Sequence, residues 1–232
     1  TASNSTDSDD ITQQTYKPGK LTIATGQPAY EPWVMNDKPE SGEGYEAAVA
    51  YAVADKLGFK KSDVVWTRTA FDTAIAPGAK DWDFNIQQFG ITDERKKAVD
   101  FSSSYYNDSQ SVVVKKDSKF ANATKVSDLK DATVGVMVGT LAYDYAKANI
   151  KDDIQTFNDD AALAQALDAG QIDALVTSTV ECVYMVQSEQ VKDSKVLGRL
   201  PDSEDKSGMG IVLPKDSKLT ARSEEHTSEL QS

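Results

Sequence analysis

The fold class is decided by the stretch GYEAAVAYAVADKLGF at residues 44–59 and by the segment DVVWT at 63–67 that follows it. Val49, Val53 and Leu57 recur at helical spacing, so the first stretch predicts an amphipathic helix. The second segment is short, apolar and β-branched, which is typical of a buried strand. A helix followed at once by a buried strand indicates a βαβ unit and hence a parallel sheet.

The same alternation of strands and helices continues along most of the chain. LTIAT at 21–25 is a further strand before the helix, and a helix near 71–76 separates 63–67 from a strand at 83–87. After a strand at 111–115, a second series of similar size has strands at 133–138 and 172–176 and helices that begin at 140 and 158, and a late strand follows at 209–214. Two such series predict an α/β protein with two lobes.

The composition excludes several classes of function. The chain has 232 residues, with 37 acidic and 25 basic side chains and a net charge of −12. This charge argues against nucleic acid or an anionic membrane surface as a partner. Cys182 is the only cysteine, so neither an internal disulfide nor a cysteine-based zinc site is expected. The acidic pairs at 152–153 and 159–160 lack the spacing of a calcium loop, so we predict no metal and no cofactor.

Both ends of the chain differ from the rest. Residues 1–16 are rich in Ser, Thr and Asp, which predicts a flexible leader, either a frayed terminus or the tether of an exported protein. Residues 222–232, RSEEHTSELQS, match the translated reading frame of a common DNA-sequencing adapter. We therefore expect a non-native tail, a natural frame that ends near Ala221 and no role for His226, the only histidine. The alternative is a natural polar tail.

Five motifs follow one another as IATGQPAYEPW, GYEAAVAYAVADKLG, ITDERKKAVDFSSSYY, VGVMVGT and AGQIDALV. Together they resemble the family 3 extracellular solute-binding proteins of ABC importers for polar amino acids, over about residues 19–219. The third closely resembles the family signature T-x-x-R-x-x-x-(hydrophobic)-x-F-S-x-x-Y. The resemblance implies a two-lobed periplasmic-binding-protein-like fold of type II, with helices flanking the sheet of each lobe and a two-segment hinge. Lobe 1 would comprise 17–112 and 207–221, and lobe 2 would comprise 113–206.

Arg95 is the strongest candidate for a ligand-binding residue. A free amino acid carries a carboxylate, which leaves water at high cost unless a charge-assisted donor replaces the solvent. Arg95 follows Thr92, a candidate helix cap, and can supply such a donor. The residues alone favour a solvated arginine beside Lys96 and Lys97, whereas the resemblance implies that Arg95 binds the ligand carboxylate.

Backbone groups are expected to bind the ligand as well. Gly139 and Thr140 stand between a predicted strand and a predicted helix, where unpaired N–H groups form a natural anion site. Ordinary helix capping by Thr140 is the alternative. The resemblance implies that the Thr140 side chain and the Leu141 amide face the ligand carboxylate. It also implies that the main chain of Gln88 and Gly90 meets the amino and carboxylate groups.

Aromatic side chains complete the candidate site. By resemblance, Tyr30 stacks on the ligand and Tyr45 walls the pocket. Phe89 is a further candidate, although core packing explains it equally well. Gln27 stands where some relatives carry an acidic side chain that reads the ligand.

The sequence departs from the family at the site for the α-ammonium group. The family carries an Asp five residues after the Asp of its G-x-(apolar)-D-A motif, and counting from Asp173 gives Ser178. A serine is neutral, and Ser178 with Glu181 also fits a helix capping box. The sequence therefore assigns no acidic side chain to the α-ammonium group of a standard α-amino acid.

These observations predict the substrate-binding component of an ABC importer. It would capture an amino acid or close analogue between its lobes and deliver it to a membrane permease. We expect a monomer outside the cytoplasm, either a tethered lipoprotein or a free periplasmic protein. The alternatives are a cyclohexadienyl dehydratase-like enzyme on the same fold and the ligand-sensing domain of a receptor. An enzyme needs a general acid or base, and the only candidates, Glu31 and Glu181, lack a partner, so we predict no catalytic residue.

Overall fold

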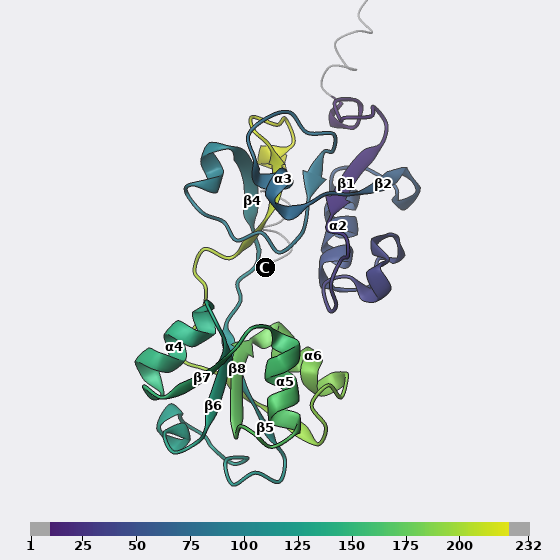
Figure 1. Cartoon of the computed structure of the whole chain (residues 1–232). Helices are drawn as coiled ribbons and strands as arrows, with labels where there is room; N and C mark the ends of the chain where they lie inside the picture. Colours follow the sequence, from purple (N-terminus) through teal and green to yellow (C-terminus); the bar gives the residue numbers. More distant parts are fainter. Residues whose placement is uncertain (1–9, 223–232) are drawn as a thin grey trace, which may run out of the picture. The chain divides into compact units, whose positions relative to one another are not determined.

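The computed structural model describes residues 10–222 (Figure 1). The start of the predicted leader, residues 1–9, and the predicted tail from 223 onward lie outside the described residues.

The described part of the predicted leader is anchored to the rest of the chain. Ile11 is buried against the apolar core, and the backbone N–H of Tyr16 donates to Oδ1 of Asp83 at 2.7 Å. An apolar side chain and a buried acceptor therefore attach residues 10–16 to unit 1.

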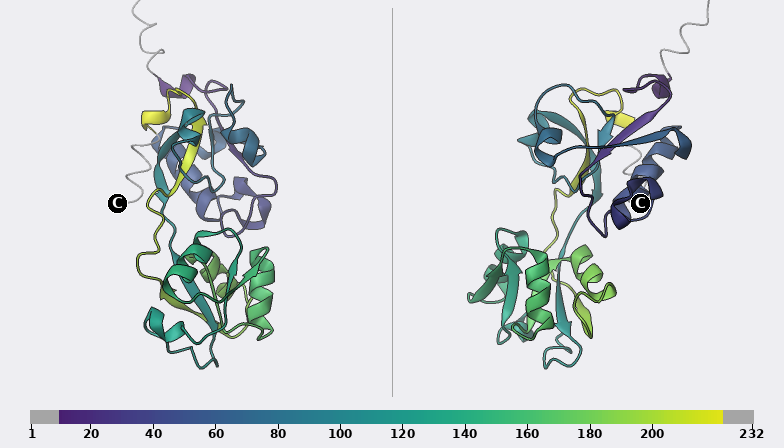
Figure 2. Two further views of the ribbon diagram at one scale, coloured as in Figure 1. Left: turned by 60° about the vertical axis from the view of Figure 1, so that its left-hand side comes forward. Right: turned by 45° about the vertical axis from the view of Figure 1, so that its right-hand side comes forward.

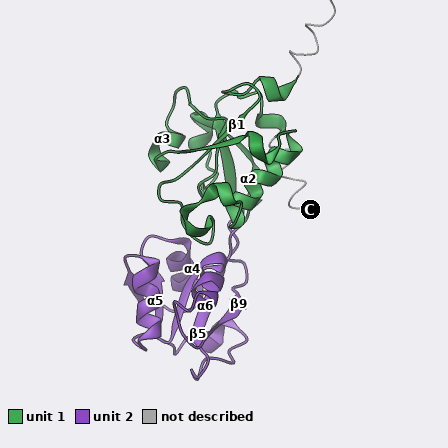
Figure 3. Ribbon diagram, turned by 90° about the vertical axis from the view of Figure 1, so that its right-hand side faces the viewer, with its two compact units in different colours: residues 1–107, 206–232 green, residues 108–205 purple. Residues whose placement is uncertain are grey.

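The chain forms two compact units (Figure 3). Unit 2 is the continuous segment Asp108–Asp205, and unit 1 comprises the described residues up to Asn107 together with those from Lys206 onward. The chain therefore passes from unit 1 into unit 2 once and returns once.

Unit 1 is built on a five-stranded sheet with the order β2-β1-β3-β10-β4. Its strands are β1 (Leu21–Thr25), β2 (Val64–Arg68), β3 (Phe84–Asn85), β4 (Val99–Tyr106) and β10 (Met209–Pro214). Its helices are α2 (Tyr45–Lys56) and α3 (Phe71–Ile75), with short 3-10 turns η1 (Ile11–Gln13), η2 (Met35–Asp37), η3 (Pro39–Ser41), η4 (Lys61–Asp63) and η5 (Arg95–Lys97). β1 runs parallel to β2 and β3, whereas β10 is antiparallel to β3 and β4.

The two helices of unit 1 cover opposite faces of its sheet (Figures 1 and 2). Ile23 of β1 packs with Val53 of α2, whereas Ala24, the next residue, packs with Ala74 of α3. This alternation follows from the period of two along a strand. Both faces are apolar, which is why the sequence of β1 reads as a continuous apolar run.

Unit 2 repeats this architecture with the strand order β7-β6-β8-β5-β9. Its strands are β5 (Gln110–Lys115), β6 (Val134–Met137), β7 (Ile154–Phe157), β8 (Ala174–Ser178) and β9 (Ser194–Arg199). Its helices are α4 (Leu141–Asn149), α5 (Asp160–Asp168) and α6 (Thr179–Gln187), with a 3-10 turn η6 (Val126–Leu129). β6 pairs in parallel with β7 and β8, and β5 is antiparallel to β8 and β9. α4 covers one face of the sheet, and α5 and α6 cover the other.

The predicted α/β architecture is confirmed, with corrections in detail. Both sheets are mixed rather than purely parallel, because β5 and β10 join them without a crossover helix. β3 is reduced to two residues. The helix predicted from Asn158 begins at Asp160, and Asp159 caps it by accepting from the Ala162 N–H at 2.7 Å. None of the helices in the described part is both long and apolar enough to cross a membrane.

Gly135, in β6, is required by the close packing of neighbouring side chains over this point of the sheet. A Cβ atom at Gly135 would lie 2.7 Å from Ile172, 3.0 Å from Phe157 and 3.1 Å from Leu163. Ile172 and Leu163 are buried, so their side chains have little room to move.

We predict that Gly135→Ala lowers the stability of the protein by about 1–3 kcal/mol, because it overpacks this core. Urea unfolding of the ligand-free protein measures the change. Gly90→Ala is the matched control, since a Cβ there meets only Arg95 Nη1, at an ordinary 3.6 Å. Equal stability of the two variants would contradict the packing argument.

Candidate functional site

The candidate residues of unit 1 lie at one edge of its sheet. Gln27 and Tyr30 follow the carboxyl end of β1, and Gln88, Gly90 and Arg95 follow the carboxyl end of β3. Since β1 and β3 are parallel neighbours, both loops leave the same edge of the sheet. Ligands of open α/β sheets bind at this edge.

The candidate residues of unit 2 occupy the equivalent position in its own sheet. Thr140 and Leu141 follow the carboxyl end of β6, and Ser178 is the last residue of β8. β6 and β8 are also parallel neighbours.

The guanidinium group of Arg95 is held in place on two sides. Nη1 donates to the carbonyl oxygen of Gly90 at 2.8 Å, and the guanidinium carbon lies 5.3 Å from the ring centre of Phe71. The backbone N–H of Arg95 donates to Oγ1 of Thr92 at 3.1 Å, although the N-cap residue of η5 is Glu94 rather than Thr92. The remaining guanidinium N–H groups have no hydrogen-bond partner among residues 10–222. Arg95 therefore presents a fixed, unneutralised set of donors.

The backbone amide of Gly90 is a second unengaged donor beside Arg95. Gly90 forms a bridge with Met209, in which Ile91 N–H donates to Gly208 and Gly210 N–H donates to Phe89, both at 3.0 Å. In an antiparallel bridge of this type the central residue points its own N–H and C=O away from the partner strand. The carbonyl of Gly90 receives Arg95, and its N–H has no partner in the described part of the chain.

The backbone N–H of Gln88 is engaged within unit 1, so the main-chain contact expected of Gln88 falls to its carbonyl group. Its backbone N–H donates to Oε2 of Glu46 at 2.8 Å, and its side-chain amide donates to Oε1 of the same carboxylate. Glu46 lies in the first turn of α2 and is fully buried. Burial raises the pKa of its carboxyl group, while hydrogen bonds from Tyr105 and Gln88 oppose this shift.

The aromatic candidates separate into exposed and buried side chains. Tyr30 is 62% exposed and Tyr45 is 43% exposed, so both can meet a ligand. Phe89 is 0% exposed and stacks on Phe71 with ring centres 4.7 Å apart. The ring of Phe89 is therefore a core side chain and cannot contact a ligand; it supports Phe71, on which Arg95 lies. Gln27 is exposed.

Tyr45 belongs to an aromatic cluster at the start of α2. Its ring lies edge-on to Trp33 and Tyr106, at 6.0 and 5.5 Å between centres, and its hydroxyl donates to the carbonyl of Tyr105 at 3.0 Å. Partial burial raises the pKa of Tyr45. Gly44 makes this start possible, because its φ is +104° and a Cβ there would lie 2.5 Å from the Trp33 carbonyl oxygen.

The hydroxyl of Thr140 serves the helix rather than a ligand. It donates to the carbonyl of Met137 at 2.7 Å and accepts from the Tyr143 N–H at 3.2 Å. Its single proton is therefore used, so it has none to give to a carboxylate. The backbone N–H groups of Leu141 and Ala142 have no partner among the described residues and remain as the anion site of α4.

Ser178 is also a helix cap, but its proton remains available. Its Oγ accepts from the Glu181 N–H at 3.3 Å, and no acceptor for its own O–H lies within the described residues. The carboxylate of Asp160 lies 3.3 Å from the hydroxyl of Thr177, the residue before Ser178. Burial raises the pKa of Asp160.

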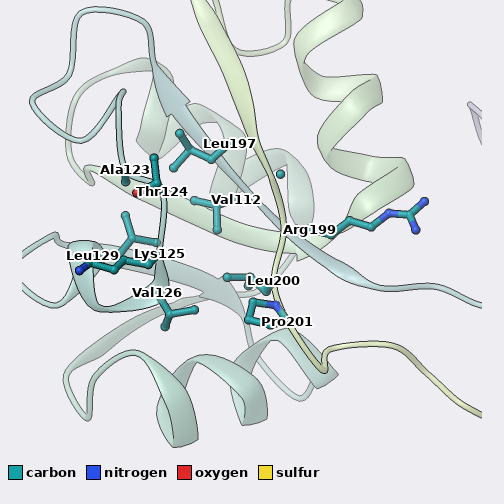
Figure 4. A pocket seen from close by; sticks show the side chains of 11 residues that line it. Val112, Ala123, Thr124, Lys125, Val126, Leu129, Leu197, Arg199, Leu200 and Pro201 are labelled. Carbon is teal, nitrogen blue, oxygen red and sulfur yellow. The ribbon is translucent and has the colours of Figure 1, made fainter.

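A small apolar hollow in unit 2 is separate from these residues. It has a volume of about 100 Å³ and is lined mainly by apolar side chains that include Val112, Leu197 and Leu200. Figure 4 shows the guanidinium of Arg199 pointing away from them. Ligand pockets are usually about 300–1,000 Å³ with convergent polar groups, so this hollow does not suit an amino acid.

Two other residues singled out from the sequence have structural roles. Cys182 is buried in the core of unit 2 and burial raises its pKa, which confirms it as a small apolar side chain. Glu31 accepts from the Asn36 N–H at 3.0 Å and lies on a loop. Within residues 10–222, no group of three or more His, Cys, Asp and Glu side chains could hold a metal.

Comparison with known proteins decides the family. A model of the bacterial extracellular solute-binding proteins, family 3, matches residues 21–169. This chain belongs to that family. The type II periplasmic-binding-protein fold predicted from the motifs is confirmed, because solved structures of such proteins match nearly the whole chain.

Individual relatives of this solute-binding protein are moderately similar. The L-arginine-binding protein of Pseudomonas aeruginosa is 28% identical over 222 residues, covering 89% of this chain and 80% of that protein. The L-cystine-binding protein TcyJ of Escherichia coli K12 is 29% identical over 188 residues, covering 80% and 68%. The solved structure of an ancestral cationic amino acid solute binding protein, AncCDT-1, matches with a TM-score of 0.72 at 28% identity, covering 93% and 91%.

The sequence analysis of this solute-binding protein missed Glu46 and Phe71. Glu46 stands four residues before Ala50 and seven before Val53, on the buried side of α2. A carboxylate on an apolar helix face is a signal that could have identified it. Phe71 gives no such signal, because only the folded chain brings it beneath Arg95.

We predict that Thr140→Ala in this solute-binding protein lowers stability by about 1 kcal/mol, because α4 loses its cap. Thr140→Ser should retain the stability. Ligand affinity should change less than about threefold in either variant, since the amides of Leu141 and Ala142 remain. Calorimetric unfolding and titration measure the two effects. A tenfold loss of affinity at unchanged stability would show that the hydroxyl itself binds the ligand.

Proposed function

We propose that this solute-binding protein captures a free amino acid, or a close analogue that keeps the α-carboxylate, for an ABC importer. The observation that carries the proposal is the Arg95 guanidinium, fixed by Gly90 and Phe71 while its remaining donors are unengaged. A pre-oriented guanidinium beside an unpaired backbone N–H matches a carboxylate in charge and in geometry. The names of the arginine-binding and cystine-binding relatives support an amino acid as the ligand.

Each unit contributes donors to this function. In unit 1, Arg95 and the Gly90 amide bind the carboxylate, and the exposed rings of Tyr30 and Tyr45 provide apolar surface for the ligand. In unit 2, the first-turn amides of α4 bind anionic groups, and the Ser178 hydroxyl serves as a neutral contact for the ammonium group. Gln27, on the loop after β1, is an uncharged residue that contacts the side chain of the ligand.

An enzymatic role is the less favoured alternative. The relatives named above are binding proteins. Glu31 is hydrogen-bonded to a loop amide, and the Glu181 backbone belongs to the cap of α6. We propose a binding protein rather than a dehydratase or a receptor domain.

The cellular setting follows from the family. Its description as extracellular supports a location outside the cytoplasm, and a solute-binding protein of an importer delivers its ligand to a membrane permease. We further propose that the protein acts as a monomer. The polar start of the sequence suits the tether of a lipoprotein as well as the leader of a free periplasmic protein.

We predict that Arg95→Ala weakens binding at least about thirtyfold, because truncating one partner of a desolvated charge pair costs about 2–5 kcal/mol. The ligand is the one of the twenty amino acids that raises the melting temperature most, and titration calorimetry measures its affinity. Lys96→Ala, which removes an exposed cation from the same turn, should leave affinity within about threefold. Unchanged affinity in Arg95→Ala would rule out Arg95 as the carboxylate donor.

We predict that Ser178→Asp raises affinity for ordinary α-amino acids, because a carboxylate there pairs with the ammonium group. The gain should be absent for the deaminated analogue of the same ligand. Competition binding on the wild type and the variant provides the comparison. A loss of affinity for every α-amino acid tested would mean that Ser178 only caps α6.

A further inference from the structure

Glu46 is buried without a cation to neutralise it. Its side chain is 0% exposed, and its carboxylate accepts from the backbone N–H of Gln88 at 2.8 Å, from the Gln88 side-chain amide and from the Tyr105 hydroxyl. These donors are neutral groups, and no lysine or arginine of the described residues pairs with Glu46. A buried carboxylate of this kind is costly, and an apolar residue of similar size would often stabilise a core more.

The carboxylate joins three elements that are distant in sequence. Glu46 lies on α2, Tyr105 lies on β4, and Gln88 lies in the loop after β3. Tyr45, the neighbour of Glu46, reinforces the connection through its hydrogen bond to the Tyr105 carbonyl.

Gln88 has a backbone conformation that needs external support. Its φ is +53°, in the left-handed region that residues other than glycine seldom adopt. Both hydrogen bonds to Glu46 are compatible with this conformation, and one of them uses the Gln88 backbone N–H itself. The carboxylate therefore stabilises a turn that the local sequence disfavours.

This turn sets the direction of the residues that follow it. Two contacts hold Phe89 in place: its ring is buried, and its carbonyl accepts from the Gly210 N–H. The backbone of the next residue, Gly90, therefore has a defined orientation. The carbonyl of Gly90 then fixes Arg95 Nη1 at 2.8 Å, while its N–H remains unengaged. The orientation of both carboxylate donors thus depends on the conformation at Gln88.

We propose that Glu46 is a positioning residue for ligand binding, which holds Gln88 in its left-handed turn so that the Gly90 amide and the Arg95 guanidinium are directed at the ligand carboxylate. This inference rests on the proposed function, in which Gly90 and Arg95 are those donors.

The test compares Glu46→Met with Asp83→Leu, its matched control. Asp83 is a second buried carboxylate of unit 1 that accepts from two backbone N–H groups, those of Tyr16 and Thr22, both at 2.7 Å. It lies before β3 rather than after it, and its hydrogen bonds go to Tyr16 and Thr22 rather than to Gln88. Both substitutions replace the carboxylate acceptors with an apolar side chain of similar size, so both are expected to lower stability.

The first readout uses the ligand-free protein. In ¹⁵N NMR spectra, Glu46→Met should shift the Gly90 amide and the Arg95 Nε–Hε resonances, and Asp83→Leu should leave both in place. The second readout is calorimetric affinity for the best-bound amino acid. Glu46→Met should weaken it about tenfold or more, Glu46→Gln, which retains an acceptor for the Gln88 N–H, should stay within about threefold, and Asp83→Leu within about twofold.

The Gln88 backbone provides an independent variant pair if Glu46→Met does not fold. Gln88→Val should reproduce the loss of affinity, because a β-branched residue resists positive φ, whereas Gln88→Gly should retain most of the affinity. Unshifted Arg95 and Gly90 resonances in Glu46→Met, or equal affinities of Gln88→Val and Gln88→Gly, would overturn the proposal. Failure of the wild-type protein to bind any of the twenty amino acids would instead overturn the proposed function, and the NMR comparison would still decide the role of Glu46.

Discussion

The parallel pairing of β1 with β3 is the constraint on which the ligand-binding surface of unit 1 depends. It sends the loop with Gln27 and Tyr30 and the loop with Gln88 and Gly90 out of the same edge of one sheet. In unit 2 the pairing of β6 with β8 does the same for Thr140 and Ser178. In each unit, separate loops therefore bring polar groups together at one edge of the sheet.

Charge is distributed unequally around the Arg95 segment. The cation is oriented by neutral groups, a carbonyl and an aromatic face, so its charge stays available for a ligand. Glu46, the anion of the same region, is buried in the core, where its carboxylate accepts hydrogen bonds from neutral donors. A salt bridge between the two would have stabilised the empty protein and neutralised the donor that a carboxylate needs. Separation of the two charges is therefore consistent with a binding site rather than with a purely structural network.

The sequence predicted the elements whose signal is local. The apolar runs of β1 and β10 and the helical spacing of α2 identified these elements within a few residues. β7 and β9 were missed because each has two exposed residues and lacks a continuous apolar run. The mixed pairing of the sheets was missed as well, since it depends on how the chain enters unit 2 as β5 and returns to unit 1 as β10.

The candidate site could be predicted from the sequence where a motif marks its residues, but not where its residues depend on tertiary contacts. The signature around Arg95 located the candidate donor, but the supports of Arg95, Phe71 and the Gly90 carbonyl, are tertiary contacts. The hydroxyl of Thr140 caps α4, as the alternative to ligand binding predicted. Its proton is used because the carbonyl of Met137, at the end of β6, accepts it, and no local pattern specifies that acceptor. The burial of Phe89 and the engagement of the Gln88 amide likewise follow from packing against α3 and α2.

The central claim is that Arg95 and the Gly90 amide bind an α-carboxylate. Its most direct test is a calorimetric comparison, on the wild-type protein, of the best-bound amino acid with its own α-carboxamide, which keeps the shape and the ammonium group but removes the negative charge. We predict that the carboxamide binds at least about thirtyfold more weakly, because the guanidinium then lacks its charged partner. Equal affinities for the amino acid and its carboxamide would contradict the claim.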